Sequence, residues 1–73
     1  MNVQQNTTIE KLSERETEVL QRMADGLSSR NIAQILGISE DTVETHRKNI
    51  YRKIDAKNAA QAMAYGFRNR LIF

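Results

Sequence analysis

Residues 40–54 carry the side chains that are best suited to recognising another molecule. If these residues form an α-helix, with about 100° between neighbours, one side of it collects polar groups that can bond the edges of nucleic acid bases. The residues on this polar side are Asp41, Thr45, Lys48 and Arg52, flanked by Glu44 and Asn49. The opposite side holds Val43, Ile50 and Ile54. The pattern therefore predicts a helix that packs against a core from behind and exposes its polar side.

The residues needed for catalysis or metal binding are scarce. The sequence has no cysteine and one histidine, His46, which lies at the edge of the predicted core side and is interpreted as structural. It has no glycine-rich phosphate loop and no paired carboxylates suited to acid–base chemistry. We therefore expect no enzymatic activity, no metal, no cofactor and no small-molecule ligand in this domain. RNA binding is disfavoured because the four aromatic residues form no stacking platform.

The charges are unevenly distributed, although the net charge is only +2. Residues 44–57 contain five cationic side chains and two carboxylates, a local charge of +3, whereas residues 13–25 have a local charge of −2. This polarity fits a basic surface that faces phosphates and an acidic surface that faces away. Ordinary solvated helix surfaces would look the same, so charge alone leaves both interpretations open.

Helix-capping signals divide the chain into four helices, at about 14–25, 29–36, 40–54 and 59–68. Ser13 and Glu16 form a capping box, and Ser28, Ser39 and Asn58 are placed to cap the next three helices. The predicted fold is a compact all-α domain over residues 12–73. Residues 1–11 are polar and lack periodicity, which predicts a disordered tail or the stub of a linker. No apolar run approaches the ~20 residues of a membrane span and no signal peptide is recognisable, so a cytoplasmic location is expected.

The second and third predicted helices are separated by a very short turn. The order is a short helix, Gly37, Ile38, the cap Ser39 and then a longer helix. This spacing is typical of the helix-turn-helix motif, in which the second helix enters the major groove of double-stranded DNA. Among the outward residues, the Glu44 carboxylate can accept a hydrogen bond from the N4 amino group of cytosine.

Candidate phosphate contacts lie near the helix starts, where free backbone amides favour anions. They are Ser28, Ser29, Arg30 and Thr42. Arg47 lies toward the core side, and its stem can pack while its guanidinium reaches a phosphate. Tyr51, beside the polar side, can either contact a phosphate or pack.

The stretch LSERETEVLQRMADGLSSRNIAQILGISEDTVETHRKNIYRKI resembles the LuxR/FixJ (GerE-type) family of bacterial effector domains. The positions that carry the resemblance are Leu12, Glu16, Val19, Leu20, Gly26, Ser29, Ile32, Ala33, Leu36, Ile38, Ser39, Thr42, Val43, His46, Asn49, Ile50 and Lys53. The resemblance covers residues 12–72. It implies sequence-specific binding of double-stranded DNA by a transcription regulator, with the helix-turn-helix motif at about 29–48.

The resemblance also implies site residues. Glu44, Thr45 and Lys48 would read base edges, while the basic end of the third helix, Arg52 and Lys53, would contact phosphates. Ala59 departs from the family pattern, which often has arginine there. Family members usually carry an N-terminal sensing domain, so this chain would be either an excised effector domain or a free-standing small regulator. RNA polymerase is a further candidate partner.

The fourth helix is implied by the resemblance to form a homodimer, and its composition agrees. Between residues 59 and 67 only one side chain is clearly polar. Ala60, Met63 and Phe67 are expected to cover the core, which leaves Ala62, Tyr65 and Gly66 for close approach of a partner. An alternative is a protein-interaction module that pairs with another LuxR-type regulator and modulates it. A helix that is simply made of small residues also remains open.

Overall fold

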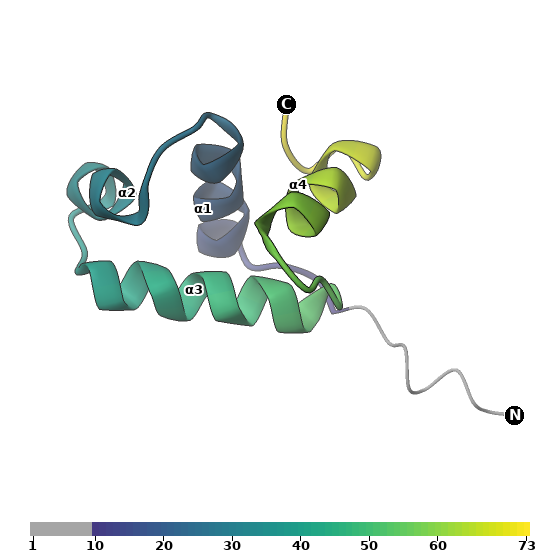
Figure 1. The fold of residues 1–73 in the computed structure, drawn as a ribbon, viewed down its shortest axis with the longest axis horizontal. Helices are drawn as coiled ribbons and strands as arrows, with labels where there is room; N and C mark the ends of the chain where they lie inside the picture. The colour runs from purple at the N-terminus through teal and green to yellow at the C-terminus, as the bar shows by residue number, and fades with distance from the viewer. Residues whose placement is uncertain (1–9) are drawn as a thin grey trace, which may run out of the picture.

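The computed structural model describes residues 10–73, which form four α-helices and no strand (Figure 1). The helices are α1 (Glu14–Ala24), α2 (Ser29–Leu36), α3 (Glu40–Lys53) and α4 (Ala59–Arg68). The prediction of a compact all-α domain with four helices is confirmed. The bounds of α2 and α4 agree with the expected ones, while α1 and α3 end one residue earlier because Asp25 and Ile54 are their C-cap residues.

All four helices begin at the predicted N-cap residues. In the capping box of α1, the Glu16 amide donates to the Ser13 hydroxyl at 3.1 Å and the Ser13 amide donates to the Glu16 carboxylate at 2.9 Å. Ser28, Ser39 and Asn58 each accept a hydrogen bond from the backbone amide three residues later. These bonds satisfy amides that have no partner within the helix, which is why the polar residues appear at these positions.

The turn between α2 and α3 depends on Gly37. This residue ends α2 with φ of 70°, in the left-handed region that side-chain-bearing residues disfavour. The next amide, that of Ile38, donates to the carbonyl of Ala33 at 3.0 Å, and Ser39 then caps α3. The two helices are therefore joined by the tight connection that the sequence predicts.

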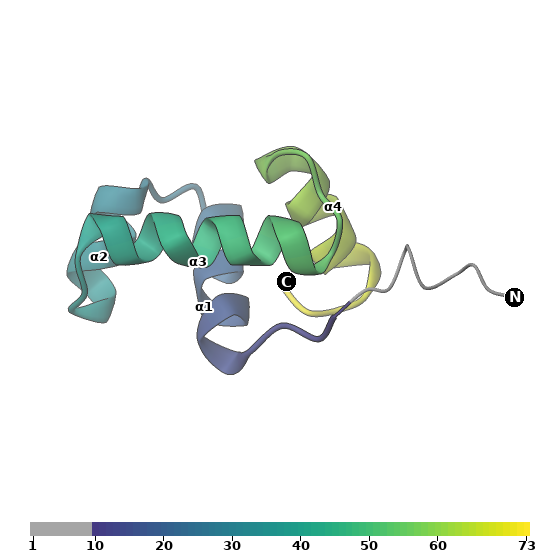
Figure 2. The same cartoon turned by 90° about the horizontal axis from the view of Figure 1, so that it is seen from below.

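The helix α3 lies along one side of the molecule and contacts the other three helices (Figure 1). In the view of Figure 2 it crosses in front of them, with its outer side uncovered over its length. The largest fully buried side chains lie between these helices and in the C-terminal segment: Val19, Leu20, Ile32, Val43, Ile50 and Ile72. None of the helices in residues 10–73 combines the length and apolarity needed to cross a membrane.

The segment after α4 folds back onto the core. Ile72 is fully buried, and the backbone amide and carbonyl of Phe73 both bond the side-chain amide of Gln21 in α1, each at 2.9 Å. A Cβ atom at Gly66 would lie 2.9 Å from the Ile72 side chain and 3.0 Å from that of Leu20. Glycine in the last turn of α4 therefore permits close packing of the C-terminal segment against the helix.

The expected faces of α4 are wrong except at Met63, which is half-buried and packs against the core as predicted. Ala62 and Gly66, which were predicted to meet a partner, are buried within the monomer, and Tyr65 is half-buried. Of the residues expected in the core, Ala60 is exposed and Phe67 is 51% exposed. The small residues face inward because Ile72 and Leu20 occupy the space beside Gly66. The surface available to a partner is therefore the opposite face, with Ala60 and Phe67.

The N-terminal segment is joined to the end of α3. Of the tail predicted over residues 1–11, residues 1–9 lie outside the described part of the chain. The Glu10 amide donates to the carbonyl of Lys53 at 2.8 Å, and Leu12 belongs to the core. Glu10 and Lys11, which were expected in the tail, therefore belong to the described part of the chain.

Candidate nucleic-acid interface

The outer surface of α3 is the candidate interface. The helix α3 is stabilised at both ends by charged side chains. Its first turn contains Glu40 and Asp41, and its last turn contains Arg52 and Lys53, which matches the sign of the helix dipole at each end. Val43 and Ile50 are fully buried and hold the inner side of the helix against the core. The orientation of α3 that the apolar spacing predicts is therefore confirmed.

The three predicted base readers are exposed on α3. Glu44, Thr45 and Lys48 all lie on the outer part of the helix, and Thr45 and Lys48 are one turn apart. Neighbouring side chains three or four residues apart share one helix face. Their hydroxyl, ammonium and carboxylate groups therefore present a donor and acceptor pattern of the kind that base edges match.

Four polar residues bridge α2 and α3 beside this surface, and we call them the Arg47 network. Arg47 Nη1 donates to Ser29 Oγ at 3.3 Å, and Arg47 Nη2 donates to the Tyr51 hydroxyl at 3.3 Å. Arg47 Nε lies 3.9 Å from Glu44 Oε1, and the Ser29 hydroxyl donates to Glu44 Oε2. The Arg47 side chain is 25% exposed, so its stem packs as predicted while its guanidinium is bonded within the protein.

Further predicted phosphate contacts lie at the N-terminal ends of α2 and α3. Ser28 caps the helix and also donates its hydroxyl to the Asn31 side chain at 2.9 Å. Arg30 is exposed, and Thr42, in the first turn of α3, shares a hydrogen bond with Ser39 at 2.9 Å. The caps occupy one amide of each helix, which leaves other first-turn amides able to face an anion.

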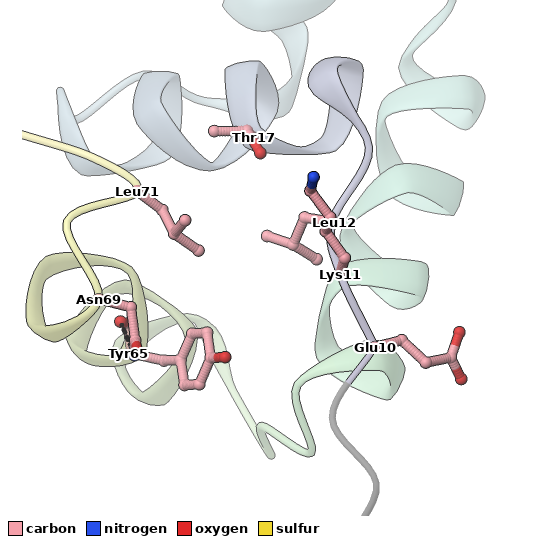
Figure 3. A pocket seen from close by; sticks show the side chains of 7 residues that line it. All are labelled: Glu10, Lys11, Leu12, Thr17, Tyr65, Asn69 and Leu71. Atoms are coloured by element: carbon pink, nitrogen blue, oxygen red, sulfur yellow. Dashed lines mark hydrogen bonds between the residues drawn. The ribbon is translucent and has the colours of Figure 1, made fainter.

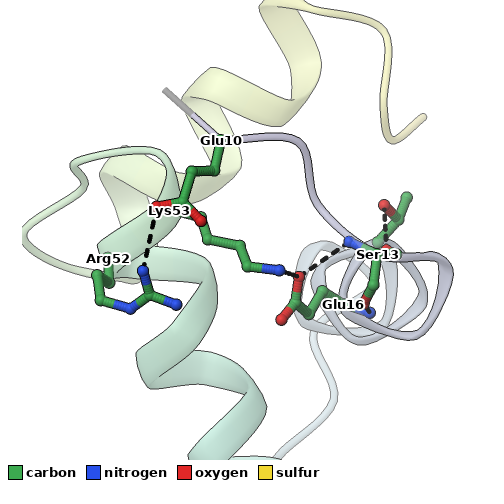
Figure 4. A network of polar contacts seen from close by, with 6 residues as sticks. Glu10, Ser13, Glu16, Arg52 and Lys53 are labelled. Atoms are coloured by element: carbon green, nitrogen blue, oxygen red, sulfur yellow. Dashed lines mark hydrogen bonds and ion pairs between the residues drawn. The ribbon is translucent and has the colours of Figure 1, made fainter. Parts of the chain in front are cut away.

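Lys53 has a different environment from the one expected of a phosphate contact (Figure 4). Its ammonium lies 2.8 Å from Glu16 Oε1, and its side chain is only 20% exposed. Arg52, in contrast, is exposed and pairs at 3.2 Å with the exposed Glu10. The sequence-based reading missed the Glu16–Lys53 ion pair, because Glu16 was assigned to capping and Lys53 to DNA. No local pattern connects residues 37 positions apart.

The Glu16 carboxyl is buried, with 5% of the residue exposed. Burial opposes its ionisation, but the hydrogen bonds from Lys53 and Ser13 and the positive charge of Lys53 outweigh burial. Together they hold the pKa of Glu16 below its ordinary value of 4.5. The ion pair therefore fixes the end of α3 against the start of α1.

A surface cavity of about 460 Å³ lies away from the outer side of α3 (Figure 3). Leu12, Tyr65 and Leu71 provide its apolar lining, between the N-terminal segment, α1 and the chain after α4. The cavity is therefore separate from the polar surface of α3 that suits a nucleic acid.

Within residues 10–73 no three histidine, cysteine, aspartate or glutamate side chains are grouped as metal ligands would be.

Comparison with known proteins identifies relatives over most of the chain. Residues 10–65 match the family model described as bacterial regulatory proteins, luxR family. The quorum-sensing regulator RhlR of Pseudomonas aeruginosa, described as HTH-type, is 59% identical over 54 residues, which are 74% of this chain and 22% of that protein. The chain spans about a fifth to two fifths of the length of the curated relatives it matches.

Solved structures share the fold. The crystal structure of Escherichia coli SdiA has a TM-score of 0.82 and 43% sequence identity, over 92% of this chain and 28% of that one. The response regulator ChrA of a heme-sensing two-component system has a TM-score of 0.80 and 44% identity, over 86% of this chain and 31% of that one.

Proposed function

The chain belongs to the luxR family of bacterial regulatory proteins and is a DNA-binding domain of that non-enzymatic family, and from this membership we propose how it binds DNA. In our proposal α3 enters the major groove and reads base pairs. Two copies bind two half-sites about one helical turn apart.

The observation that carries this proposal is the uncovered outer side of a helix that is fixed from behind. Val43 and Ile50 are fully buried, whereas Thr45, Lys48 and Arg52 are exposed. A major groove is about 12 Å wide and admits a single α-helix. A rigid helix with a polar outer side loses little conformational freedom on entering the groove, which favours precise recognition.

We assign base reading to Glu44, Thr45 and Lys48. Lys48 can donate to O6 and N7 of guanine, and Glu44 can accept from the amino group of cytosine. The proposed phosphate contacts are Ser28, Ser29 through its backbone amide, Arg30, Thr42 and Arg52. We leave out Lys53, whose ammonium is engaged by the buried Glu16, and Arg47, whose guanidinium bonds Ser29 and Tyr51.

The test is selection of bound sequences from a random DNA pool, followed by affinity measurements on the selected site. We expect a symmetric site, an affinity that falls steeply with salt, and a cost of about 1–3 kcal/mol for Lys48→Ala with relaxed choice at one base pair. Arg52→Ala should weaken binding to all sequences alike. An unchanged affinity of Lys48→Ala for its site would refute the placement of α3.

We propose that dimers form through the exposed face of α4, around Phe67 and Ala60. Phe67 is 51% exposed, and isologous contact of two such faces would cover it. Phe67→Glu should then abolish cooperative filling of the two half-sites, while Phe73→Glu, at an exposed residue outside α4, should not. Equal cooperativity in both variants would contradict this interface.

The same exposed face supports a second candidate function, pairing with a different LuxR-type regulator. Mixing this protein with a full-length family member and measuring heterodimers would detect it. Heterodimers that form while the protein alone selects no DNA sequence would favour this function over direct DNA recognition. RNA polymerase stays a predicted partner.

A further inference from the structure

The Arg47 network places a charged residue of α3 where it contacts the protein more than the solvent. Each of the three guanidinium nitrogens faces a partner: Ser29 and Tyr51 at 3.3 Å, and Glu44 at 3.9 Å. These partners come from α2 and from the turns of α3 on both sides of Arg47. An arginine that clamps a phosphate presents its planar pair of donors outward. Here the donors converge on neighbouring side chains.

The network also controls the carboxylate of Glu44. One of its oxygens accepts the Ser29 hydroxyl, and the other lies beside Arg47. The Glu44 side chain is nevertheless 53% exposed, so its remaining lone pairs are open to a ligand. The carboxylate is thus accessible, and its orientation is set by bonds to the protein.

We propose that Arg47, Ser29 and Tyr51 are positioning residues that hold the Glu44 carboxylate in one orientation for reading a base pair. This inference rests on the proposed function. Tyr51 acts only through Arg47, one turn away, and touches no base in this arrangement. A carboxylate free to rotate would accept from amino groups at several positions, whereas a fixed one discriminates between base pairs.

The first test compares the base preferences of variants, measured by selection from the random DNA pool and by Kd on sites with single base-pair changes. Glu44→Gln should alter the preference at one base pair of each half-site. Tyr51→Phe, which removes only the hydroxyl, should reduce discrimination at that same base pair by about three- to tenfold, with other positions changed less than about twofold. A uniform loss at all positions would overturn the proposal.

Arg47→Lys distinguishes positioning from phosphate binding. Lysine keeps the charge and binds phosphate well, but a single ammonium cannot reach the three partners of the guanidinium. We expect Arg47→Lys to relax discrimination at the Glu44 base pair as Tyr51→Phe does. The proposal is wrong if Arg47 behaves as a phosphate ligand. In that case Arg47→Lys keeps the wild-type base preference, and Arg47→Gln lowers the salt dependence of DNA binding by as much as Arg52→Gln does.

A double-mutant cycle completes the test. Tyr51→Phe should have no further effect at that base pair once Glu44→Gln is present, because its action requires the carboxylate. With Thr45→Val as the control, the effects of the two changes should add. Full additivity of Tyr51→Phe with Glu44→Gln would overturn the proposal. Urea unfolding of each variant identifies any loss of fold.

The outcome separates this inference from the function on which it rests. If the wild-type protein enriches no sequence, the proposed function fails. If it enriches a site and Lys48→Ala changes the choice of base, but Tyr51→Phe leaves every preference unchanged, only the positioning role fails.

Discussion

Glu16→Gln should destabilise the fold through the ion pair alone. Glutamine has nearly the same volume as glutamate and also serves in capping boxes, so the bond to the Ser13 amide can persist. The substitution removes the negative charge that lies 2.8 Å from the Lys53 ammonium. Its effect therefore measures the contribution of the charge.

The expected loss is about 2 kcal/mol. Removing one partner of a fully buried pair costs about 3–5 kcal/mol, because the other charge is left without compensation. Lys53 is 20% exposed and can reach water in part, which lowers the cost toward that of a charged hydrogen bond, about 1.5–3 kcal/mol. A chain of this length has a total stability of about 4–10 kcal/mol, so the loss is substantial. It should lower Tm by about 8–16 °C.

The pH dependence provides a second readout. Because the pKa of Glu16 is lowered in the folded protein, its ionised form contributes stability above the unfolded pKa, near 4.5. That contribution is lost as the pH falls through the lower folded pKa. Urea unfolding followed by circular dichroism, at about pH 7, 5, 4 and 3, should therefore show the difference between wild type and Glu16→Gln shrinking below pH ~4.5.

The matched control is Glu18→Gln, on the same helix. Glu18 lies 3.9 Å from Arg15, and both side chains are more than two-fifths exposed, so the loss should stay below about 0.5 kcal/mol. Equal stability of Glu16→Gln and wild type at neutral pH would refute the reasoning, as would a difference that does not depend on pH.

Three further substitutions probe the packing and the turns, each measured by urea unfolding. Ile72→Ala should lower the free energy of unfolding by about 2–4 kcal/mol, because it empties a buried site beside Gly66. The control Phe73→Ala should lower it by less than about 0.5 kcal/mol. Equal losses in the two variants would contradict the packing of the C-terminal segment. Asp55→Gly should stabilise by about 0.5–1 kcal/mol, because Asp55 has φ of 55°, and a destabilised variant would speak against this. Gly37→Ala should cost about 1–2 kcal/mol through its φ of 70°, and an unaffected variant would exclude the left-handed turn.

The start of each helix and the orientation of α3 could be predicted from the sequence because their signals are local. A cap such as Ser39 acts on the amide three residues later, and the apolar spacing of Val43 and Ile50 identifies the inner side of one helix. Both features depend on residues within a few turns of the same helix, so they can be inferred without knowledge of the fold.

The face of α4 could not be predicted because its residues hardly differ in polarity. Ala60, Ala62, Met63 and Gly66 are all small or apolar, and the side that packs inward is decided by Ile72, which follows the helix. A chain segment after the last helix shows no periodicity, so nothing marked Ile72 as a core residue. The tertiary contact therefore overrides the composition of the helix.

The sequence predicted which residues of the candidate site are exposed, but it did not predict the hydrogen bonds and ion pairs that join them to other helices. Thr45 and Lys48 are exposed as their helix positions indicate. The engagement of Lys53 by Glu16 and of Arg47 by Ser29 joins different helices, and long basic side chains can point either outward or toward a distant partner. Sequence position alone does not distinguish the two.

The bonds between Gln21 and Phe73 have a practical consequence for labelling. In one bond the Phe73 amide donates to Gln21, and in the other the Phe73 carbonyl accepts from it. A following peptide would leave both main-chain groups in place, and the Phe73 ring faces solvent. A fluorophore or affinity tag fused after Phe73 should thus be tolerated. An insertion between Arg68 and Ile72 should detach the C-terminal segment from Gly66 and loosen the whole domain.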